Sequence, residues 1–345
     1  MRLVKFVALI LLAASSALAD SPRLGLLTDL SGPMSSWGKQ TQAGARLALK
    51  DARSDGMDVE IVFGDNQLQA KAAVSEANKL LTADKVDAVF SEFTPTTIAI
   101  APILIRRDVF LLYSAAAASP LELGMGVYKT YMNYVEACAM TAAEFKKRGV
   151  RAPALLKSIN EFGELCLQGI KRVFPDPIVV DYSTGEDVRV QVLNLKKRGA
   201  DCVINPAFIS DFSRMLKAMG ELQYYPFVSA NNDAMDPRVM AEFPQIAAHA
   251  YSFSLPQPPG ALLDRCMSQG FCDNRDNPSA VMLGYLHTKQ LLQAVWSCSQ
   301  KGHRAQRECI AEAFAASPVD STLGFQGWQN RQAAFELRLV QWGSD

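Results

Sequence analysis

Residues 24–53 read LGLLTDLSGPMSSWGKQTQAGARLALKDAR, and this stretch decides the fold class. A short apolar run at 24–28 leads into a loop rich in Ser, Gly and Pro, and an amphipathic segment follows at 40–53. A buried strand followed by a loop and a helix is the repeating unit of a parallel sheet. We therefore expect these residues to form the first unit of an α/β domain.

The same alternation continues along the rest of the chain. The first series has further strands at 59–63, 86–90 and 109–112 and helices at 40–53, 70–81 and 96–106. After residue 134 it restarts, with strands at 154–156, 178–180, 202–205 and 227–229 and helices at 135–147, 164–173, 188–198 and 211–219. The helices expected at 280–298 and 308–315 belong neither to a new series of strands nor to a tail. We therefore expect the chain to return to the first lobe there. The pattern predicts two doubly wound lobes.

The N-terminal residues predict export. Arg2 and Lys5 precede an apolar stretch at 6–14, and small residues lead up to Ala19, which is the pattern of a signal peptide cleaved near Ala19. We therefore expect residues 1–19 to be removed and the protein to be freely soluble in the periplasm. The chain has 345 residues with 35 basic and 35 acidic side chains, which favours two lobes and gives no indication of nucleic-acid binding.

Seven cysteines in an exported chain suggest disulfides, and the odd count leaves at least one thiol unpaired. No CxxC or Cys/His cluster indicates a metal, and we expect no cofactor. The expected short-loop pairs are Cys266 with Cys272 and Cys298 with Cys309, whereas Cys138, Cys166 and Cys202 lie in apolar contexts that favour a core position.

Two loops at the carboxyl edge of the first sheet are candidates for ligand binding. Thr94 follows a strand as a plausible N-cap, with Pro95 in the first helical position, so the free N–H groups there could hold an anionic or polar group. The alternative is an ordinary capped helix. Trp37, in the loop at 31–38, could line a cleft or pack onto its own lobe, and the loop lacks the GxGxxG of a dinucleotide site.

The corresponding loops of the second lobe carry Phe162, Phe208 and Asn231, which offer apolar faces and an amide. Each could also be a turn or core residue, but their shared position after successive strands favours a ligand site. Only three histidines and no GxSxG motif are present, so the sequence argues against an enzyme.

A set of short motifs extends over nearly all the mature chain, at residues 24–33, Trp37-Gly38, Gly44, 47–48, 86–89, 94–97, 101–103, Phe162-Gly163 and 199–203. In the order and spacing of these motifs the chain resembles leucine/isoleucine/valine-binding-type receptors of ABC transporters. The resemblance implies a type I periplasmic binding fold with three crossovers and a hinge. Lobe 1 would hold residues 20–134 and about 262–322, and lobe 2 about 135–261 and 323–345. It also implies a monomer that delivers a small amino-acid-like or related organic solute to an inner-membrane permease, or alternatively a sensor that signals to a membrane kinase or chemoreceptor.

The resemblance also implies where the ligand binds. The family's ligand loops fall on Trp37, Thr94, Thr96, Ala116, Ala118, Phe162, Phe208 and Asn231. Two positions depart from the amino-acid-binding pattern, because Ala118 replaces a threonine that holds the ligand and Asn231 replaces an acid that faces its ammonium group. Asp233 could supply that acid instead.

Overall fold

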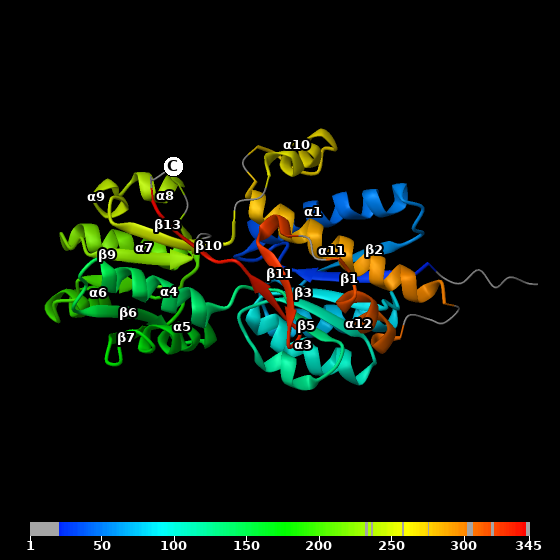
Figure 1. Cartoon of the computed structure of the whole chain (residues 1–345), viewed down its shortest axis with the longest axis horizontal. Coiled ribbons are helices and arrows are strands. Elements are labelled where there is room, and N and C mark those ends of the chain that lie inside the picture. The colour runs from blue at the N-terminus through cyan, green and yellow to red at the C-terminus, as the bar shows by residue number, and fades with distance from the viewer. Residues whose placement is uncertain are drawn as a thin grey trace, which may run out of the picture.

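The computed structural model describes residues 21–231, 234–235, 237–256, 259–274, 276–301, 306–318 and 321–342. These residues form two α/β lobes that lie side by side, each built on one sheet (Figure 1). The expected signal segment 1–19 and the candidate acid Asp233 lie outside the described residues. Within the described part, every helix is too short or too polar to cross a membrane.

The first sheet has seven strands in the order β11-β12-β5-β4-β3-β1-β2. Its strands β1 to β5 run parallel to their neighbours, and β11 pairs antiparallel with β12. The strands are β1 (Arg23–Thr28), β2 (Glu60–Asp65), β3 (Ala88–Glu92), β4 (Phe110–Ser114), β5 (Val127–Lys129), β11 (Phe325–Gln329) and β12 (Gln332–Phe335).

Helices cover both faces of this sheet because alternate strand residues point to opposite sides. Leu26 and Phe90 face one apolar cluster, whereas Val89 and Leu111 face the other. The first cluster is closed by α1 (Ser35–Ser54), α11 (Pro278–Ser299) and α12 (Arg307–Ala315), and the second by α2 (Ala70–Thr82) and α3 (Thr94–Arg106). Two shorter helices, η1 (Ser119–Leu123) and α10 (Gly260–Ser268), lie beside this lobe (Figure 1).

The second sheet has six strands in the order β13-β10-β9-β8-β6-β7, and only β13 runs antiparallel to its neighbour. Its strands are β6 (Pro153–Ser158), β7 (Ile178–Tyr182), β8 (Cys202–Ile204), β9 (Phe227–Asn231), β10 (Ala250–Ser254) and β13 (Arg338–Gln341). Its helices are α4 (Tyr134–Lys147), α5 (Glu161–Lys171), α6 (Arg189–Lys197), α7 (Ile209–Glu221), α8 (Pro237–Ala241) and α9 (Pro244–Ala247).

The chain passes between the two sheets three times, which gives the expected three-crossover arrangement. The first crossover joins β5 to α4, the second joins β10 to α10, and the third joins β12 to β13. The C-terminal segment differs from the expected boundary at residue 323. β11 and β12 extend the first sheet through the pairing of β12 with β5, and β13 alone joins the second sheet.

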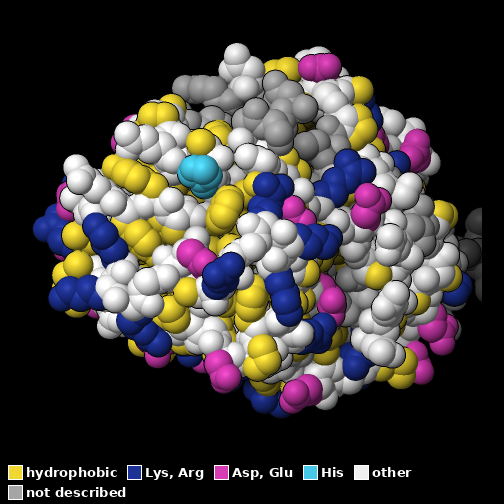
Figure 2. Space-filling model, turned by 60° about the vertical axis from the view of Figure 1, so that its left-hand side comes forward, with side chains coloured by type: hydrophobic (Ala, Val, Ile, Leu, Met, Phe, Trp, Pro, Cys, Tyr) yellow, Lys and Arg dark blue, Asp and Glu magenta, His cyan; other side chains and the backbone are white. Residues whose placement is uncertain are grey.

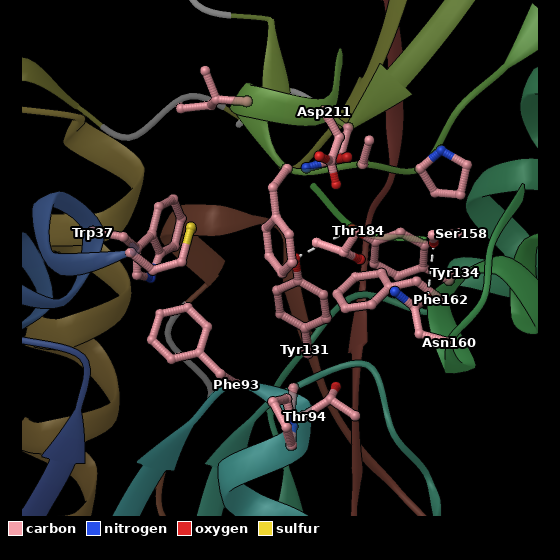
Figure 3. A pocket seen from close by; sticks show the side chains of 18 of the residues that line it. Trp37, Phe93, Thr94, Tyr131, Tyr134, Ser158, Asn160, Phe162, Thr184 and Asp211 are labelled. Carbon is pink, nitrogen blue, oxygen red and sulfur yellow. Dashed lines mark hydrogen bonds between the residues drawn. The ribbon is translucent and has the colours of Figure 1, made fainter. Parts of the chain in front are cut away.

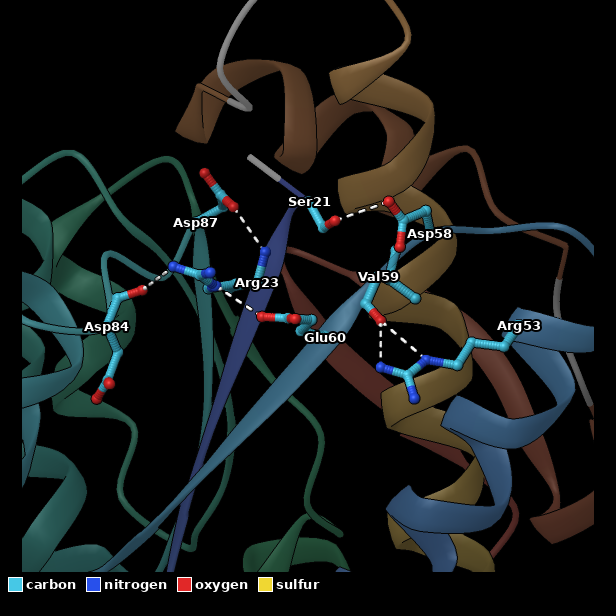
Figure 4. Close-up of polar contacts among 8 residues, drawn as sticks. All are labelled: Ser21, Arg23, Arg53, Asp58, Val59, Glu60, Asp84 and Asp87. Carbon is cyan, nitrogen blue, oxygen red and sulfur yellow. Dashed lines mark hydrogen bonds and ion pairs between the residues drawn. The ribbon is translucent and has the colours of Figure 1, made fainter. Parts of the chain in front are cut away.

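Polar contacts hold the amino end of β1 in place (Figure 4). This end lies at the edge of the first sheet that is opposite the candidate ligand-binding loops. The backbone N–H of Arg23 donates to Asp87 at 2.8 Å, and its guanidinium pairs with Glu60 at 2.8 Å. Ser21 donates to Asp58 at 2.7 Å. These three contacts join β1 to the neighbouring segments of the same lobe.

The described residues contain three disulfides, of which two are the expected pairs Cys266–Cys272 and Cys298–Cys309. The third joins Cys138 to Cys166, which were expected to pack as core residues. Their Cα atoms lie 5.2 Å apart because α4 and α5 pack closely, and a Cβ at Gly169 would lie only 2.2 Å from a carbonyl oxygen of α4. Cys202 is a buried free thiol, as expected.

Candidate functional site

A cavity lies between the two lobes at the carboxyl ends of the strands, and it encloses about 780 Å³ including its open mouth. Side chains reach it from both lobes (Figure 3). Five of the eight expected ligand residues line it, namely Trp37, Thr94, Phe162, Phe208 and Asn231. The described lining also contains Met34, Glu92, Phe93, Pro95, Ser114, Ala115, Tyr131, Tyr134, Ser158, Asn160, Tyr182, Thr184, Pro206, Ala207, Ile209 and Asp211.

Trp37 enters the cavity from the first turn of α1, and not from a loop as the sequence suggested. The helix begins five residues earlier than expected because the Asp29 carboxylate binds the turn before it, accepting the N–H groups of Gly32 and Met34. Gly38 lets this turn approach β1, since a Cβ there would lie 1.9 Å from the Asp29 carbonyl oxygen. The half-buried indole is therefore fixed in position at the cavity wall.

Phe93 occupies the turn between β3 and α3 in a conformation that side-chain-bearing residues rarely adopt. Its φ is 71° and its ψ is 138°, and it takes the N-cap position that we expected for Thr94. Such a conformation costs about 1–3 kcal/mol and persists where the surrounding structure enforces it, often at functional sites. The turn brings the Phe93 ring beside Trp37 (Figure 3), while the Thr94 hydroxyl accepts the Ala117 N–H at 3.4 Å.

Glu92, the last residue of β3, is the most unusual member of the cavity wall. Its side chain is only 2% exposed, and its carboxylate accepts hydrogen bonds from three neutral groups. The indole N–H of Trp37 and the hydroxyl of Thr41 each donate to Oε1 at 3.1 Å, and the hydroxyl of Thr28 donates to Oε2. Burial raises the pKa of Glu92 to about 7, since no basic side chain offsets the loss of hydration.

Sequence reasoning missed Glu92 because the strand was expected to end two residues earlier, at Phe90. The available signal was a glutamate directly after an apolar strand and before a helix, at the edge where parallel sheets bind ligands. With the strand ended at Phe90, the position of Glu92 was assigned to the loop.

Aromatic rings form the opposite side of the cavity. Tyr131 in the first crossover stacks on Tyr134 at a centroid distance of 5.7 Å, and Tyr134 meets Phe162 edge to face at 4.8 Å. Phe162 in turn contacts Phe208 at 6.0 Å. Figure 3 shows the rings of Tyr131, Tyr134 and Phe162 facing Trp37 and Phe93 across the cavity. Such a wall buries an apolar or aromatic ligand body well.

Polar side chains of the second lobe also line the cavity. The buried Asn231 has a side-chain oxygen without a hydrogen-bond partner in the described structure. An unpaired buried acceptor is costly, so a bound ligand or water would relieve it. Asp211 forms an ion pair with Arg214 at 2.6 Å and accepts the N–H of Gly185 at 3.0 Å.

Three expected ligand residues do not line the cavity. Thr96 is fully buried, and its hydroxyl donates to the Glu92 carbonyl oxygen at 2.7 Å. The Ala116 carbonyl oxygen accepts from Lys129 at 2.6 Å, and burial lowers the pKa of that amine to about 8. The backbone N–H of Ala118 donates across the cleft to Glu161 at 3.0 Å. These backbone groups are therefore occupied by the protein itself.

The described lining contains two carboxylates, Glu92 and Asp211, and none of its residues is Lys, Arg or His. No group of described residues has the composition of a metal site. On the outer surface, basic and acidic side chains are interspersed over the face shown in Figure 2. The cavity can thus enclose a small, mostly apolar molecule with a few hydrogen-bonding groups.

Two lobes joined by three crossovers, with a cavity between them, define the architecture of a receptor that closes around a small solute. The chain belongs to the periplasmic binding protein family, whose model matches residues 21–345. Membership in this family supports a periplasmic solute-binding role.

Relatives and solved structures agree with this assignment. The chain is 21% identical to the leucine-, isoleucine-, valine-, threonine- and alanine-binding protein of Pseudomonas aeruginosa, over 100% of this chain and 96% of the relative. It is similar in structure to a branched-chain amino acid transporter substrate-binding protein from Streptococcus pneumoniae bound to isoleucine, with a TM-score of 0.79, 16% identity and 93% and 96% coverage. A solute-binding protein from R. palustris bound to 4-hydroxybenzoate gives a TM-score of 0.76, 16% identity and 93% coverage of both chains. These structures confirm the type I periplasmic binding fold.

Proposed function

We propose that this protein is the substrate-binding component of an ABC importer and that it binds a small amino-acid-like or related organic solute between its lobes. The observation that carries the proposal is the cavity lined from both sheets, with Trp37 and Phe93 on one side and Phe162 and Phe208 on the other. A ligand that contacts both lobes stabilises their closed arrangement, because only closure brings both sets of contacts together.

The size and lining of the cavity favour an apolar or aromatic body with few polar groups. Two solved structures with this fold hold isoleucine and 4-hydroxybenzoate, which are a small amino acid and a small aromatic acid. The unpaired oxygen of Asn231 supports a hydrogen bond from the solute. We infer that the protein binds its ligand without chemical turnover, as its relatives are binding proteins.

Mass spectrometry of small molecules released from purified, denatured protein tests the proposal without a prior choice of ligand. The identified molecule is then added back to refolded, ligand-free protein. Binding restricted to the folded state should raise the unfolding free energy by roughly 2.7 kcal/mol at a hundredfold excess over Kd. Failure of every released molecule, and of a panel of amino acids, amides and organic acids, to raise Tm would refute solute binding.

The importer assignment needs a separate test in cells. Removal of the gene should abolish uptake of the radiolabelled solute, and complementation with the parent gene should restore it. Complementation with a Trp37→Ala variant should restore uptake only in part, since the indole lines the cavity. Normal uptake in the deletion strain would point to a sensing role for the same bound molecule.

A further inference from the structure

A buried carboxylate without a basic partner lies on the wall of the cavity, and its environment indicates what the ligand carries. Glu92 is 2% exposed, and its three hydrogen-bond donors, from Thr28, Trp37 and Thr41, are all uncharged. A buried carboxylate is normally paired with a cation because neutral donors replace only part of its hydration. Within the described lining, the protein supplies no such cation.

Two buried or partly buried basic groups of the lobes are engaged elsewhere. Lys129 donates to the carbonyl oxygen of Ala116 and does not line the cavity. Arg214 pairs with Asp211, the other acid of the lining, at 2.6 Å. Asp211 thus has its counter-ion inside the protein, whereas Glu92 does not.

Glu92 also has hydrogen-bonding capacity that the described contacts do not use. A carboxylate offers about four lone-pair directions, and the described contacts use two at Oε1 and one at Oε2. Trp37, one of the two residues that donate to Oε1, lies at the cavity wall. Its ring faces Phe93 and the tyrosine and phenylalanine rings on the opposite side of the cavity (Figure 3). Aromatic faces attract a desolvated cation and also bury an apolar body.

We propose that Glu92 is the counter-ion for an ammonium group carried by the solute, so that the cleft selects ligands that join an amine to an aromatic or branched apolar body. The inference rests on the proposed solute-binding function and adds the chemical class of the ligand. It assigns the amine to the end of β3 in the first lobe, and not to the second-lobe position where Asn231 replaces an acid.

Two matched sets of probes test the assignment by calorimetry or thermal shift on refolded, ligand-free protein. One set is phenylalanine, 2-phenylethylamine and 3-phenylpropanoate, and the other is leucine, isopentylamine and 4-methylpentanoate. Within each set the body is constant while the ammonium and carboxylate groups are removed in turn. A charge-assisted hydrogen bond predicts that the amine binds at least roughly tenfold tighter than the matching carboxylate.

The Glu92→Gln variant keeps the size of the side chain and removes its charge. It should weaken binding of the amine and the amino acid by roughly tenfold or more, and leave the carboxylate unchanged or tighter. Glu164→Gln on α5 is the matched control, since Glu164 pairs with Lys157 outside the cavity lining and should alter none of the three affinities.

The outcomes separate this inference from the proposed function. Binding of carboxylates but not amines would overturn the role of Glu92 and leave solute binding intact. Equal loss of all probes in Glu92→Gln would also overturn it, because that pattern indicates a structural role only. The preference of the parent protein for amines over carboxylates is a test that does not depend on whether the variant folds. If none of the six probes binds, the inference is rejected, and the mass-spectrometric experiment then decides the function independently.

Discussion

Replacing Glu92 by Gln should make the folded protein more stable at neutral and alkaline pH than the parent is, and the advantage should disappear in acid. The pKa of Glu92 rises from 4.5 to about 7 on folding because the carboxyl group is buried. Its contribution to stability is therefore fully present below pH 4.5 and is lost as the pH rises through about 7. A shift of this size corresponds to roughly 3 kcal/mol of unfolding free energy.

The buried His287 acts in the opposite direction over part of this range. Burial lowers its pKa to about 3, so its contribution is present above pH 6.5 and is lost as the pH falls. Because the parent and the Glu92→Gln variant share His287, the difference between their unfolding free energies isolates Glu92. The amide oxygen of Gln can still accept from the indole N–H of Trp37 and the hydroxyl of Thr41, and the hydroxyl of Thr28 can rotate to accept from the amide NH2 group.

Urea unfolding of ligand-free protein, followed by circular dichroism at pH 5, 6, 7 and 8, measures this difference. We expect the variant to gain roughly 2–3 kcal/mol relative to the parent between pH 5 and pH 8, with unchanged m-values. A difference that is independent of pH would refute the argument, because it would show that Glu92 titrates near its ordinary pKa in the folded protein.

Three further predictions concern the cleft and its supports. Glu161→Ala removes the hydrogen bond from Ala118 that crosses the cleft, so the ligand should dissociate roughly fivefold faster in stopped-flow experiments. Peptide mapping without reduction should recover Cys138 and Cys166 in one cross-linked species. Trp37→Ala should weaken ligand binding by tenfold or more in calorimetry through lost contact area, with a smaller effect on Tm.

Each of these has a contradicting result. Glu164→Ala on the same helix is the control for Glu161→Ala, and equal dissociation rates in the two variants would exclude a latch across the cleft. Alkylation of Cys138 and Cys166 as free thiols in exported protein would reject their pairing. A large loss of stability with unchanged affinity in Trp37→Ala would show that the indole only packs its own lobe.

The architecture is predictable from sequence because it rests on patterns that repeat along the chain. Apolar runs like the one that contains Leu26, and amphipathic segments like the one after Trp37, recur in both lobes and form strands and helices there. The predicted bounds of these elements lie within a few residues of those observed. Ligands of parallel sheets bind at the carboxyl ends of the strands, and this rule makes Trp37, Thr94 and Phe162 candidates for the cavity that they line. The family resemblance then assigns all three to the ligand loops.

Part of what was missed is local, because the Asp29 carboxylate binds N–H groups only three and five residues further along the chain, in the turn before α1. The rest depends on contacts between segments far apart in the chain. The N–H of Phe93 donates to the Ser114 carbonyl oxygen on β4 while Phe93 holds a positive φ, and α3 begins directly after it. Likewise, the pairing of Cys138 with Cys166 follows from the close approach of α4 and α5 and has no local sequence signal. The neutral surroundings of Glu92 come from β1 and α1 together.

The central claim is that a solute is bound between the lobes in the cavity that Trp37 and Phe162 line from opposite sides. A crystal structure of the protein with its copurified or added ligand tests this claim most directly. We predict electron density for the solute between these two rings, in contact with residues of both lobes. A ligand bound at any other place on the protein, with this cavity holding only water, would contradict the account.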